Sequence, residues 1–209
     1  MKIFPKGNQQ IFFTSDSHYD HRNICKATSN WPEDSYTRDF PGVKAMNDRL
    51  VQEINDMVGE DDILFHLGDM AFKPEMVKQF RNRINCKNIH WILGNHDWRV
   101  KEDPKPFLDM FSSMSEYKYV MIYLEGEEDE DPIKLVLCHY PISSWQGMCG
   151  GTIHLHGHLH CLEHDKMGKG MTLDVGVDGN NYKPYSLDEV LALMIDKDPC
   201  EPFTHPVLR

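Results

Sequence analysis

Four histidines stand at every second position of the segment TIHLHGHLH, which runs from Thr152 to His160. In an extended chain alternate side chains share a face and recur roughly every 6.6–6.8 Å, so neighbouring imidazoles can reach two metal ions about 3.5–4 Å apart. A helical site would instead place two histidines four positions apart on a single ion. The spacing therefore indicates a paired metal site at a strand edge or in a tight loop, although an ordinary polar strand face carries the same pattern.

Other side chains that can bind metals accompany apolar runs that are typical of buried strands. These runs and their residues are Ile11–Thr14 with Asp16 and His18, Asp62–Leu67 with Asp69, Ile89–Leu93 with Asn95 and His96, and Ile133–Tyr140 with His139. Because α/β sheets hold ligands at the carboxyl ends of their strands, we expect these side chains to meet. Carboxylate, amide and imidazole groups suit Mn, Fe, Ni or Zn, whereas the lack of clustered cysteines argues against an iron–sulfur or cysteine-rich zinc site.

The elements that must position these residues alternate between strands and amphipathic helices. Helices are expected at Val43–Val58, closed by Gly59, at Pro74–Arg83, and from the capping box at Ser186 to Met194. Further strands are expected at Tyr117–Leu124, in a hairpin with Ile133–Tyr140, and at Leu173–Asp178. This order predicts a layered or sandwiched α/β domain with mixed sheets covered by helices.

The composition suits one globular domain, because 40% of the 209 residues are hydrophobic and 26% are charged. We expect this domain over residues 1–209, with a core at 11–194 and an irregular tail at 195–209. No membrane span or signal sequence is present, so we expect a cytoplasmic protein with reduced cysteines and no membrane partner. The net charge of −11 opposes an extended nucleic-acid surface, although six of the acids lie in a predicted loop at 125–131.

The order of the motifs is the most specific feature of the sequence. The motifs are Asp16-x-His18, Gly68-Asp69, Gly94-Asn95-His96-Asp97, His139 and Gly157-His158-x-His160. In this order they resemble the calcineurin-like metallophosphoesterase superfamily. His21-Arg22-Asn23-Ile24, His139-Tyr140-Pro141 and Val175-Gly176-Val177-Asp178 extend the resemblance to the small phosphoesterases of bacteria and phages. The resemblance covers residues 11 to 194.

The resemblance implies a four-layer α/β/β/α sandwich of two mixed sheets flanked by helices, with two divalent metal ions at the strand ends. By position, Asp16, His18 and His160 would bind one ion. Asn95, His139 and His158 would bind the other, and Asp69 would bridge them. A hydroxide shared by the ions would attack phosphorus, and His96 would protonate the leaving group as general acid. The ions would be Mn, Ni, Fe or Zn, with Mn the first choice in vitro.

Residues beside these motifs have less specific roles. We expect His21, Arg22 and Tyr140 to contact the substrate, the arginine through bidentate contacts to phosphate. We expect His66, His154 and His156 to be structural residues. Gly157 is expected to provide the turn that aims His158 and His160.

Two positions depart from the family pattern. Phe72 stands where many relatives have an acidic residue that orients the acid histidine, and Asp20 stands where a glycine is common. Asp97 adjoins His96 in sequence and is an alternative partner for its ring.

The sequence predicts a metal-dependent phosphoesterase that hydrolyses phosphomonoesters or phosphodiesters of a small or nucleotide substrate. A nuclease acting on single-stranded ends is one alternative, but no basic and aromatic stripe is present to hold a polymer. A non-catalytic scaffold that binds a protein partner is the other. The retained His96 and the full ligand set favour the enzyme.

Overall fold

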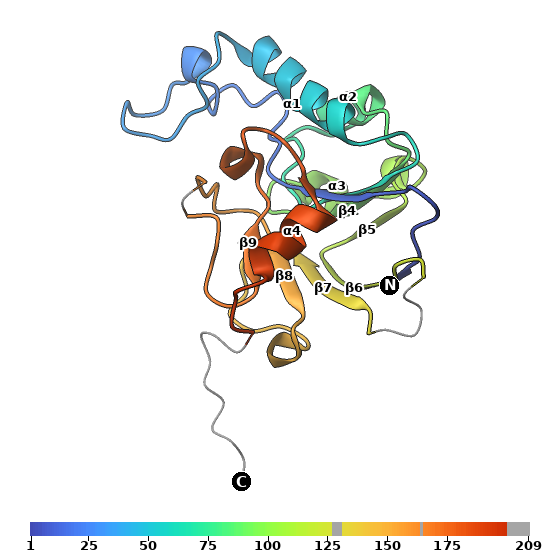
Figure 1. Cartoon of the computed structure of the whole chain (residues 1–209). Helices are drawn as coiled ribbons and strands as arrows, with labels where there is room; N and C mark the ends of the chain where they lie inside the picture. The colour runs from blue at the N-terminus through green and yellow to red at the C-terminus, as the bar shows by residue number, and fades with distance from the viewer. Residues whose placement is uncertain (127–130, 164, 200–209) are drawn as a thin grey trace.

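The fold consists of two five-stranded sheets, which Figure 1 shows together with their helices. The computed structural model describes residues 1–126, 131–163 and 165–199. The first sheet has the order β10 (Tyr185–Ser186), β2 (Ile11–Thr14), β3 (Ile63–His66), β4 (Asn88–Ile92) and β5 (Ser113–Ser115). The second has the order β1 (Lys2–Ile3), β6 (Tyr117–Ile122), β7 (Ile133–Cys138), β8 (Ile153–His156) and β9 (Thr172–Asp174).

Strands β2, β3 and β4 lie parallel in the first sheet, in register through Phe12, Leu64 and Ile89. Every residue of β2 and β3 is buried, since the sheet has packed side chains on both faces. These strands are therefore continuous apolar runs instead of alternating ones. Because they are parallel, their carboxyl ends share one edge, and the residues that follow them meet there.

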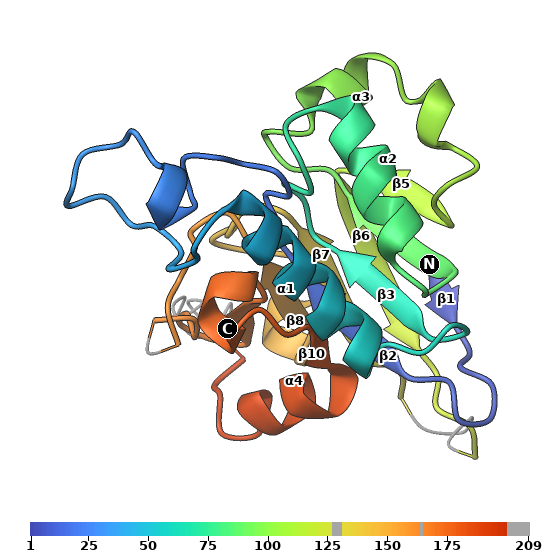
Figure 2. The ribbon, with the colours of Figure 1, turned by 90° about the horizontal axis from the view of Figure 1, so that it is seen from above.

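Helices α1 (Val43–Met57) and α2 (Pro74–Arg83) lie over the first sheet, as the view from above shows (Figure 2). In α1 the side chains of Met46, Leu50 and Ile54 recur every four residues and are almost completely buried. They pack in one core cluster with outward-facing residues of β2, β3 and β4 and with the short helix α3 (Trp98–Glu102). Burying each such side chain contributes about 1.5–3 kcal/mol, which fixes the helix on the sheet.

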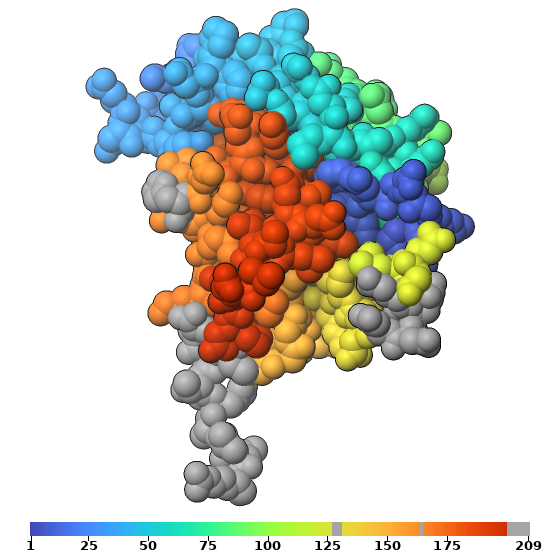
Figure 3. Space-filling view, viewed as in Figure 1, coloured from blue at the N-terminus to red at the C-terminus, as the bar shows by residue number. Residues whose placement is uncertain are grey.

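A second core lies between the sheets and is closed by α4 (Leu187–Met194). The capping box begins this helix, because the Ser186 Oγ accepts the Glu189 N–H (3.2 Å) and the Glu189 carboxylate accepts the Ser186 N–H (2.7 Å). In Figure 3 the red segment around α4 lies between the cyan helical layer and the yellow to orange strands. No helix in the described parts of the chain is both long and apolar enough to cross a membrane.

The outward side of β8 is covered by irregular chain around Trp145 and the short 3-10 helix Met148–Gly150. The Trp145 ring lies 5.2 Å from the ring of His154, and its Nε1 donates to the Thr152 carbonyl (2.7 Å). The predicted α/β class with two mixed sheets and flanking helices is confirmed.

The predicted strand at Leu173–Asp178 is wrong in its second half. Strand β9 ends at Asp174, whose carboxylate accepts the Gly176 N–H (2.7 Å), and Val177–Asn180 then form a 3-10 helix. After this local hydrogen bond Gly176 pairs with Ser15, which follows β2 of the first sheet, and β9 does not continue. The expected closure of α1 also differs, because Gly59 makes no left-handed cap and its N–H donates to the Asp62 carboxylate (2.7 Å).

Some expectations concern parts of the chain that the structure does not describe. Residues 127–130 of the predicted acidic loop and residues 200–209 of the predicted tail lie outside the described residues, as does Cys200. The five other cysteines are free thiols, namely Cys25, Cys86, Cys138, Cys149 and Cys161.

His66 ends β3 and is buried beneath the loop that follows β2. Its Nε2 lies 2.8 Å from the Ser17 Oγ, whereas its buried Nδ1 has no hydrogen-bond partner. Burial lowers the pKa of His66 to about 3, despite an opposing contribution from Asp69. This histidine is therefore neutral in the folded protein and holds Ser17, between Asp16 and His18.

We predict that His66 makes the metal-free protein lose stability as the pH falls below 6.5. The unfolded histidine takes up a proton near pH 6.5, whereas the folded one resists protonation until about pH 3. Protonation therefore stabilises only the unfolded chain, by up to about 1.4 kcal/mol per pH unit. Urea unfolding in chelator at pH 7, 6 and 5 should show a shallower loss in His66→Gln than in the parent protein. Parallel slopes would contradict the prediction.

Candidate metal centre

Two groups of side chains meet where the carboxyl ends of the two sheets converge. They are Asp16, His18 and His160, and Asp69, His139 and His158. Within each group the ligand-type atoms all lie within 4.8 Å of one another. Six of the seven predicted metal ligands therefore form two adjacent clusters, and Asn95 lies against the second.

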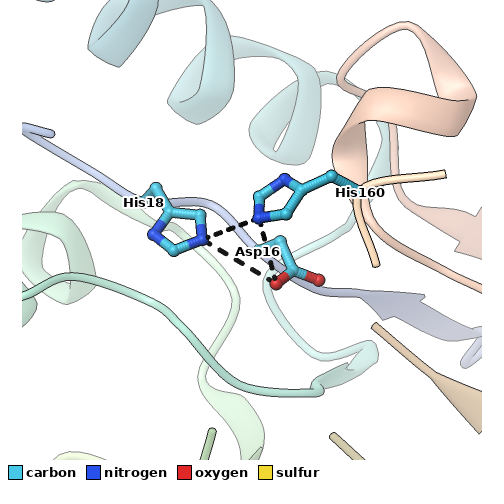
Figure 4. A group of neighbouring side chains, drawn as sticks. All are labelled: Asp16, His18 and His160. Atoms are coloured by element: carbon cyan, nitrogen blue, oxygen red, sulfur yellow. Dashed lines mark hydrogen bonds and ion pairs between the residues drawn. The ribbon is translucent and has the colours of Figure 1, made fainter. Parts of the chain in front are cut away.

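In the first group, three atoms point toward one position (Figure 4). The Nε2 atoms of His18 and His160 lie 3.1 Å apart, and the Asp16 Oδ1 lies 3.8 Å from the first and 3.9 Å from the second. Asp16 is completely buried, yet its Oδ1 has no hydrogen-bond partner. Burial raises the pKa of Asp16 to about 6, although His160 and His139 lower it. A cation between these three atoms would compensate the buried carboxylate, so the donor set fits a divalent ion.

In the second group the Asn95 side chain joins two histidines. Its Oδ1 lies 2.9 Å from the His139 Nε2 and 2.9 Å from the His158 Nδ1. The His139 ring is held from behind, because its Nδ1 donates to the Leu67 carbonyl (2.8 Å). That bond leaves the His139 Nε2 unprotonated in the neutral ring, as a metal ligand requires.

Asp69 lies between the two groups. Its Oδ2 is 3.7 Å from the His18 Nε2 and 3.4 Å from the His139 Nε2, while its Oδ1 accepts the His96 backbone N–H (2.8 Å). Burial alone would raise the pKa of Asp69, but the hydrogen bond and charge of His139 lower it below its ordinary value. The side chain is therefore an ionised carboxylate that faces both groups.

Five of these residues have a left-handed backbone, with φ between 45° and 75°. They are Asp16, His18, Asp69, His158 and His160. Residues with a Cβ rarely adopt this region, and each such residue costs about 1–3 kcal/mol. The strained residues cluster at one edge of the sheets. There the unfavourable backbone conformation directs their side chains into the site.

Gly157 does not provide the turn that the sequence suggested. Its φ is not positive, and the left-handed residues are His158 (φ 75°) and His160 (φ 51°) themselves. Strand β8 ends at His156, so the pair lies beyond the extended chain. A Cβ on Gly157 would collide with the Ser15 Oγ and the Asp16 Oδ2. Glycine is required there because the two sheets approach each other closely.

The expected structural histidines of β8 face away from the clusters. His154 is completely buried, with its Nδ1 3.2 Å from the Val136 carbonyl, and burial lowers its pKa to about 4. His156 is also buried, and its Nδ1 lies 3.0 Å from the Gly157 carbonyl. Neither belongs to a metal-type group in the described residues.

His96 lies beside Asp69 at the mouth of the site. Its side chain is 39% exposed, and its Nε2 is 3.9 Å from the Asp69 Oδ2. Burial lowers the pKa of His96, and the Asp69 carboxylate opposes this. The Phe72 ring packs on the His96 ring with centroids 4.2 Å apart, at the position where an acidic partner was missing.

Asp97 is buried, and its carboxylate accepts hydrogen bonds from backbone N–H groups of the loops that carry Asp69 and Asn95. Its Oδ2 accepts the backbone N–H groups of Asp69 (2.8 Å) and Gly94 (2.7 Å), and its Oδ1 accepts that of Met70 (3.3 Å). Asp97 thus joins the loops after β3 and β4, and among the described residues its side chain accepts hydrogen bonds from backbone groups and not from the His96 ring.

The predicted substrate residues surround the clusters. The His21 ring lies 5.8 Å from the His18 ring, and Arg22 is exposed beside it. On the other side the Tyr140 ring lies 5.1 Å from the His139 ring and 4.9 Å from the His158 ring. The His21 and Tyr140 rings therefore lie next to the clusters, and Arg22 follows His21 in the chain.

Arg38 and Asp178 form a buried ion pair that the sequence analysis did not identify. The Arg38 Nε and Nη2 donate to the two Asp178 oxygens (2.7 and 2.9 Å), and both side chains are fully buried. Arg38 also donates to the backbone carbonyls of Asp16 (2.7 Å) and Ser17 (2.8 Å). The Asp178 Oδ2 lies 2.7 Å from the His160 Nδ1. The pair therefore holds His160 and the Asp16 loop, and a lone arginine in an irregular segment gave no sequence signal.

The fold and site define an α/β protein with two adjacent metal-type clusters at the strand ends. The calcineurin-like phosphoesterase family model matches residues 10–162. That match covers well over half of the chain, so the protein belongs to the calcineurin-like phosphoesterase family. The resemblance inferred from the motifs is confirmed.

Two known proteins are similar to this chain, one in sequence and one in fold. An uncharacterized protein of Methanocaldococcus jannaschii is 30% identical over 192 residues, which cover 89% of this chain and 92% of that protein. The crystal structure of a protein of unknown function from Aquifex aeolicus covers 89% of this chain and 100% of its own, with a TM-score of 0.61 and 21% identity. The second similarity is one of fold.

We predict that Arg38→Met weakens both folding and metal binding. The change removes the cation beside the buried Asp178, which keeps only the His160 ring (2.7 Å) and the Tyr36 hydroxyl (2.9 Å) as partners. Breaking a buried ion pair in this way costs about 3–5 kcal/mol of unfolding free energy. The change also leaves Asp178, which orients the His160 ring, without the arginine that fixes its position. Loss of such an orienting contact lowers metal affinity about 10–100-fold. Urea unfolding and calorimetric titration with Mn would measure the two effects.

The double variant Arg38→Met with Asp178→Leu is the control, because it removes the stranded charge. It should recover part of the unfolding free energy while metal affinity stays low. With Asp178→Leu alone completing the cycle, a double-variant loss equal to the sum of the two single-variant losses would show that the two residues are not coupled.

Proposed function

We propose that this protein is a metal-dependent phosphoesterase that hydrolyses a phosphomonoester or phosphodiester bond of a small or nucleotide substrate. The observation that carries the proposal is the position of Asp69 between two ligand groups, with the half-buried His96 next to it. We assign Asp16, His18 and His160 to one ion, Asn95, His139 and His158 to the other, and Asp69 to both. Mn is the preferred ion in vitro, and the protein acts in the cytoplasm.

Two divalent ions, when bound, would supply a nucleophile from water at neutral pH and positive charge for the phosphate oxygens. The residues of the chain divide the remaining work. Neutral imidazoles and the Asn95 amide add no negative charge that would repel a phosphate, whereas Asp16 and Asp69 balance part of the positive charge. Tyr140 borders one side of the substrate position, and His21 and Arg22 border the other.

His96 is the group that would move a proton. In the reaction the oxygen of water forms a new bond to phosphorus, and the bond from phosphorus to the ester oxygen breaks. The protonated His96 Nε2 gives its proton to that departing oxygen, which leaves as an alcohol. The neighbouring Asp69 carboxylate favours the protonated ring, which the burial of His96 opposes. The exposed part of the ring can then regain a proton from solvent.

A non-catalytic scaffold is the alternative from a different class of protein. It would not need a half-exposed histidine beside the clusters, and in the described parts of the chain the His96 side chain makes no hydrogen bond of the kind that a structural role would require. A polymer substrate is disfavoured by the net charge of −11.

We predict that Mn-loaded protein cleaves aryl phosphodiesters or phosphomonoesters and that His96→Ala loses most of this activity. Removing a general acid lowers turnover by about 10²–10⁴-fold with alkyl leaving groups, and by less with nitrophenyl esters, which leave without a proton. Steady-state kinetics with both ester types, together with metal analysis, would measure this. Loss of bound metal in His96→Ala would contradict the acid role, and full metal occupancy without hydrolysis of any ester would favour the scaffold.

We predict that Asp69→Asn weakens the binding of both ions. The neutral amide keeps the shape of the side chain but removes the charge that faces both groups. Calorimetric titration with Mn should show a lower affinity for each of two ions. Loss of one ion alone would place Asp69 in a single site. Asp188→Asn on the surface of α4 is a matched control for the change in charge.

A further inference from the structure

An aromatic ledge made of Phe72, His21 and Trp31 extends outward from His96. The Phe72 ring lies 4.2 Å from the His96 ring and 4.4 Å from the His21 ring, and the His21 ring meets the Trp31 ring edge-on at 5.4 Å. Phe72 and His21 are partly exposed, and Trp31 is 41% exposed. The rings are therefore connected with one another, yet they keep surface on which a further ring can stack.

A pocket of about 320 Å³ lies against this ledge. Phe72, His21 and Met76 line it with apolar surface, and Arg22 and Lys73 contribute two cations. Asp20 contributes one carboxylate, so the charged side chains of the lining carry a net charge of +1. This local positive charge is opposite in sign to the net charge of −11 of the whole chain. The pocket combines a stacking surface with charges that suit an anion.

The place of the pocket relative to His96 defines which part of a substrate it would hold. If His96 protonates the departing oxygen, the group bonded to that oxygen must lie beside His96. Phe72 covers the His96 ring on this side, and the pocket begins at Phe72. The pocket therefore lies on the leaving-group side of the site and not on the phosphoryl side.

We propose that this pocket binds the leaving group and selects a nucleoside phosphate, with the base stacked on the Phe72 ledge and the phosphate beside Arg22 and Lys73. The inference rests on the proposed phosphoesterase function, because His96 defines the leaving-group side. The proposal gives Phe72 a role in substrate specificity. An acidic residue at this position would repel the phosphate of the leaving group, whereas the Phe72 ring can stack on its base.

The test measures binding of the leaving-group product to Mn-loaded protein. AMP is the probe with base and phosphate, while ribose 5-phosphate lacks the base and adenosine lacks the phosphate. We expect AMP to bind at least tenfold more tightly than either by calorimetry. Saturating inorganic phosphate should not displace AMP, because phosphate occupies the metal side and AMP the pocket. Displacement by phosphate, or equal binding of AMP and ribose 5-phosphate, would overturn the proposal.

Variants of the ledge complete the test. Phe72→Leu keeps the apolar volume but removes the ring, and we expect AMP affinity to fall about tenfold, the size of one base-stacking contact. Binding of ribose 5-phosphate should not change, and Phe72→Tyr should retain AMP binding. Phe4→Leu, at an exposed ring directly after β1, is the control for a phenylalanine change elsewhere. Unchanged AMP affinity in Phe72→Leu would overturn the role of the ring.

These outcomes separate the inference from the proposed function. The binding experiments need no turnover, so they report on the pocket even if the esters are not cleaved. Absence of hydrolysis with normal, Phe72-dependent AMP binding would refute the phosphoesterase and hence the leaving-group assignment. Hydrolysis of esters with no AMP binding would refute the pocket alone.

Discussion

The hydrogen bond from the His158 backbone N–H to the Asp16 carboxylate (2.9 Å) joins the two sheets at the edge where the site forms. It exists because Gly157 has no side chain where the chain touches Ser15 and Asp16. The bond links one residue of each metal-type group directly. The separation of the groups is therefore set by the contact between two sheets and not by the surrounding loops. Since sheets packed on both faces move little, the arrangement is preorganised for ions at a fixed spacing.

The close approach of the two sheets also costs free energy of folding, and interactions of the surrounding chain offset this cost. The left-handed backbone of Asp16 and His18 and the burial of Asp16 both disfavour the fold. Arg38 counters this by donating to the carbonyls of Asp16 and Ser17 while it pairs with Asp178. A buried arginine is itself expensive unless its donors are satisfied, and here the ion pair and two carbonyls satisfy it. The structure that supports the site is thus a polar network inside the protein.

The sequence predicted the buried strands and the residues after them because each strand is a short apolar run followed by side chains that can bind metals. It predicted the capping box at Ser186 for the same local reason. It could not predict Arg38, whose partners Asp178 and Asp16 are distant in sequence. It assigned the wrong role to Gly157, because a glycine that permits a close approach of two segments cannot be distinguished in the sequence from one that permits a turn. Contacts between segments that are far apart in sequence leave no local pattern, and both errors concern such contacts.

The two parts of the site are built on different supports. The residues assigned to the ions follow buried strands and are fixed by backbone hydrogen bonds, such as the one from the His18 N–H to the Asp69 carbonyl (3.0 Å). Phe72, where the resemblance to the family implied an acidic residue, stands instead in the segment between β3 and α2, and Arg22 stands in the segment after β2. Loops on a rigid scaffold can change without disturbing the strands. In the proposed function, the ligands of the ions therefore belong to the strand ends, while the proposed choice of leaving group depends on the segments that carry Phe72 and Arg22.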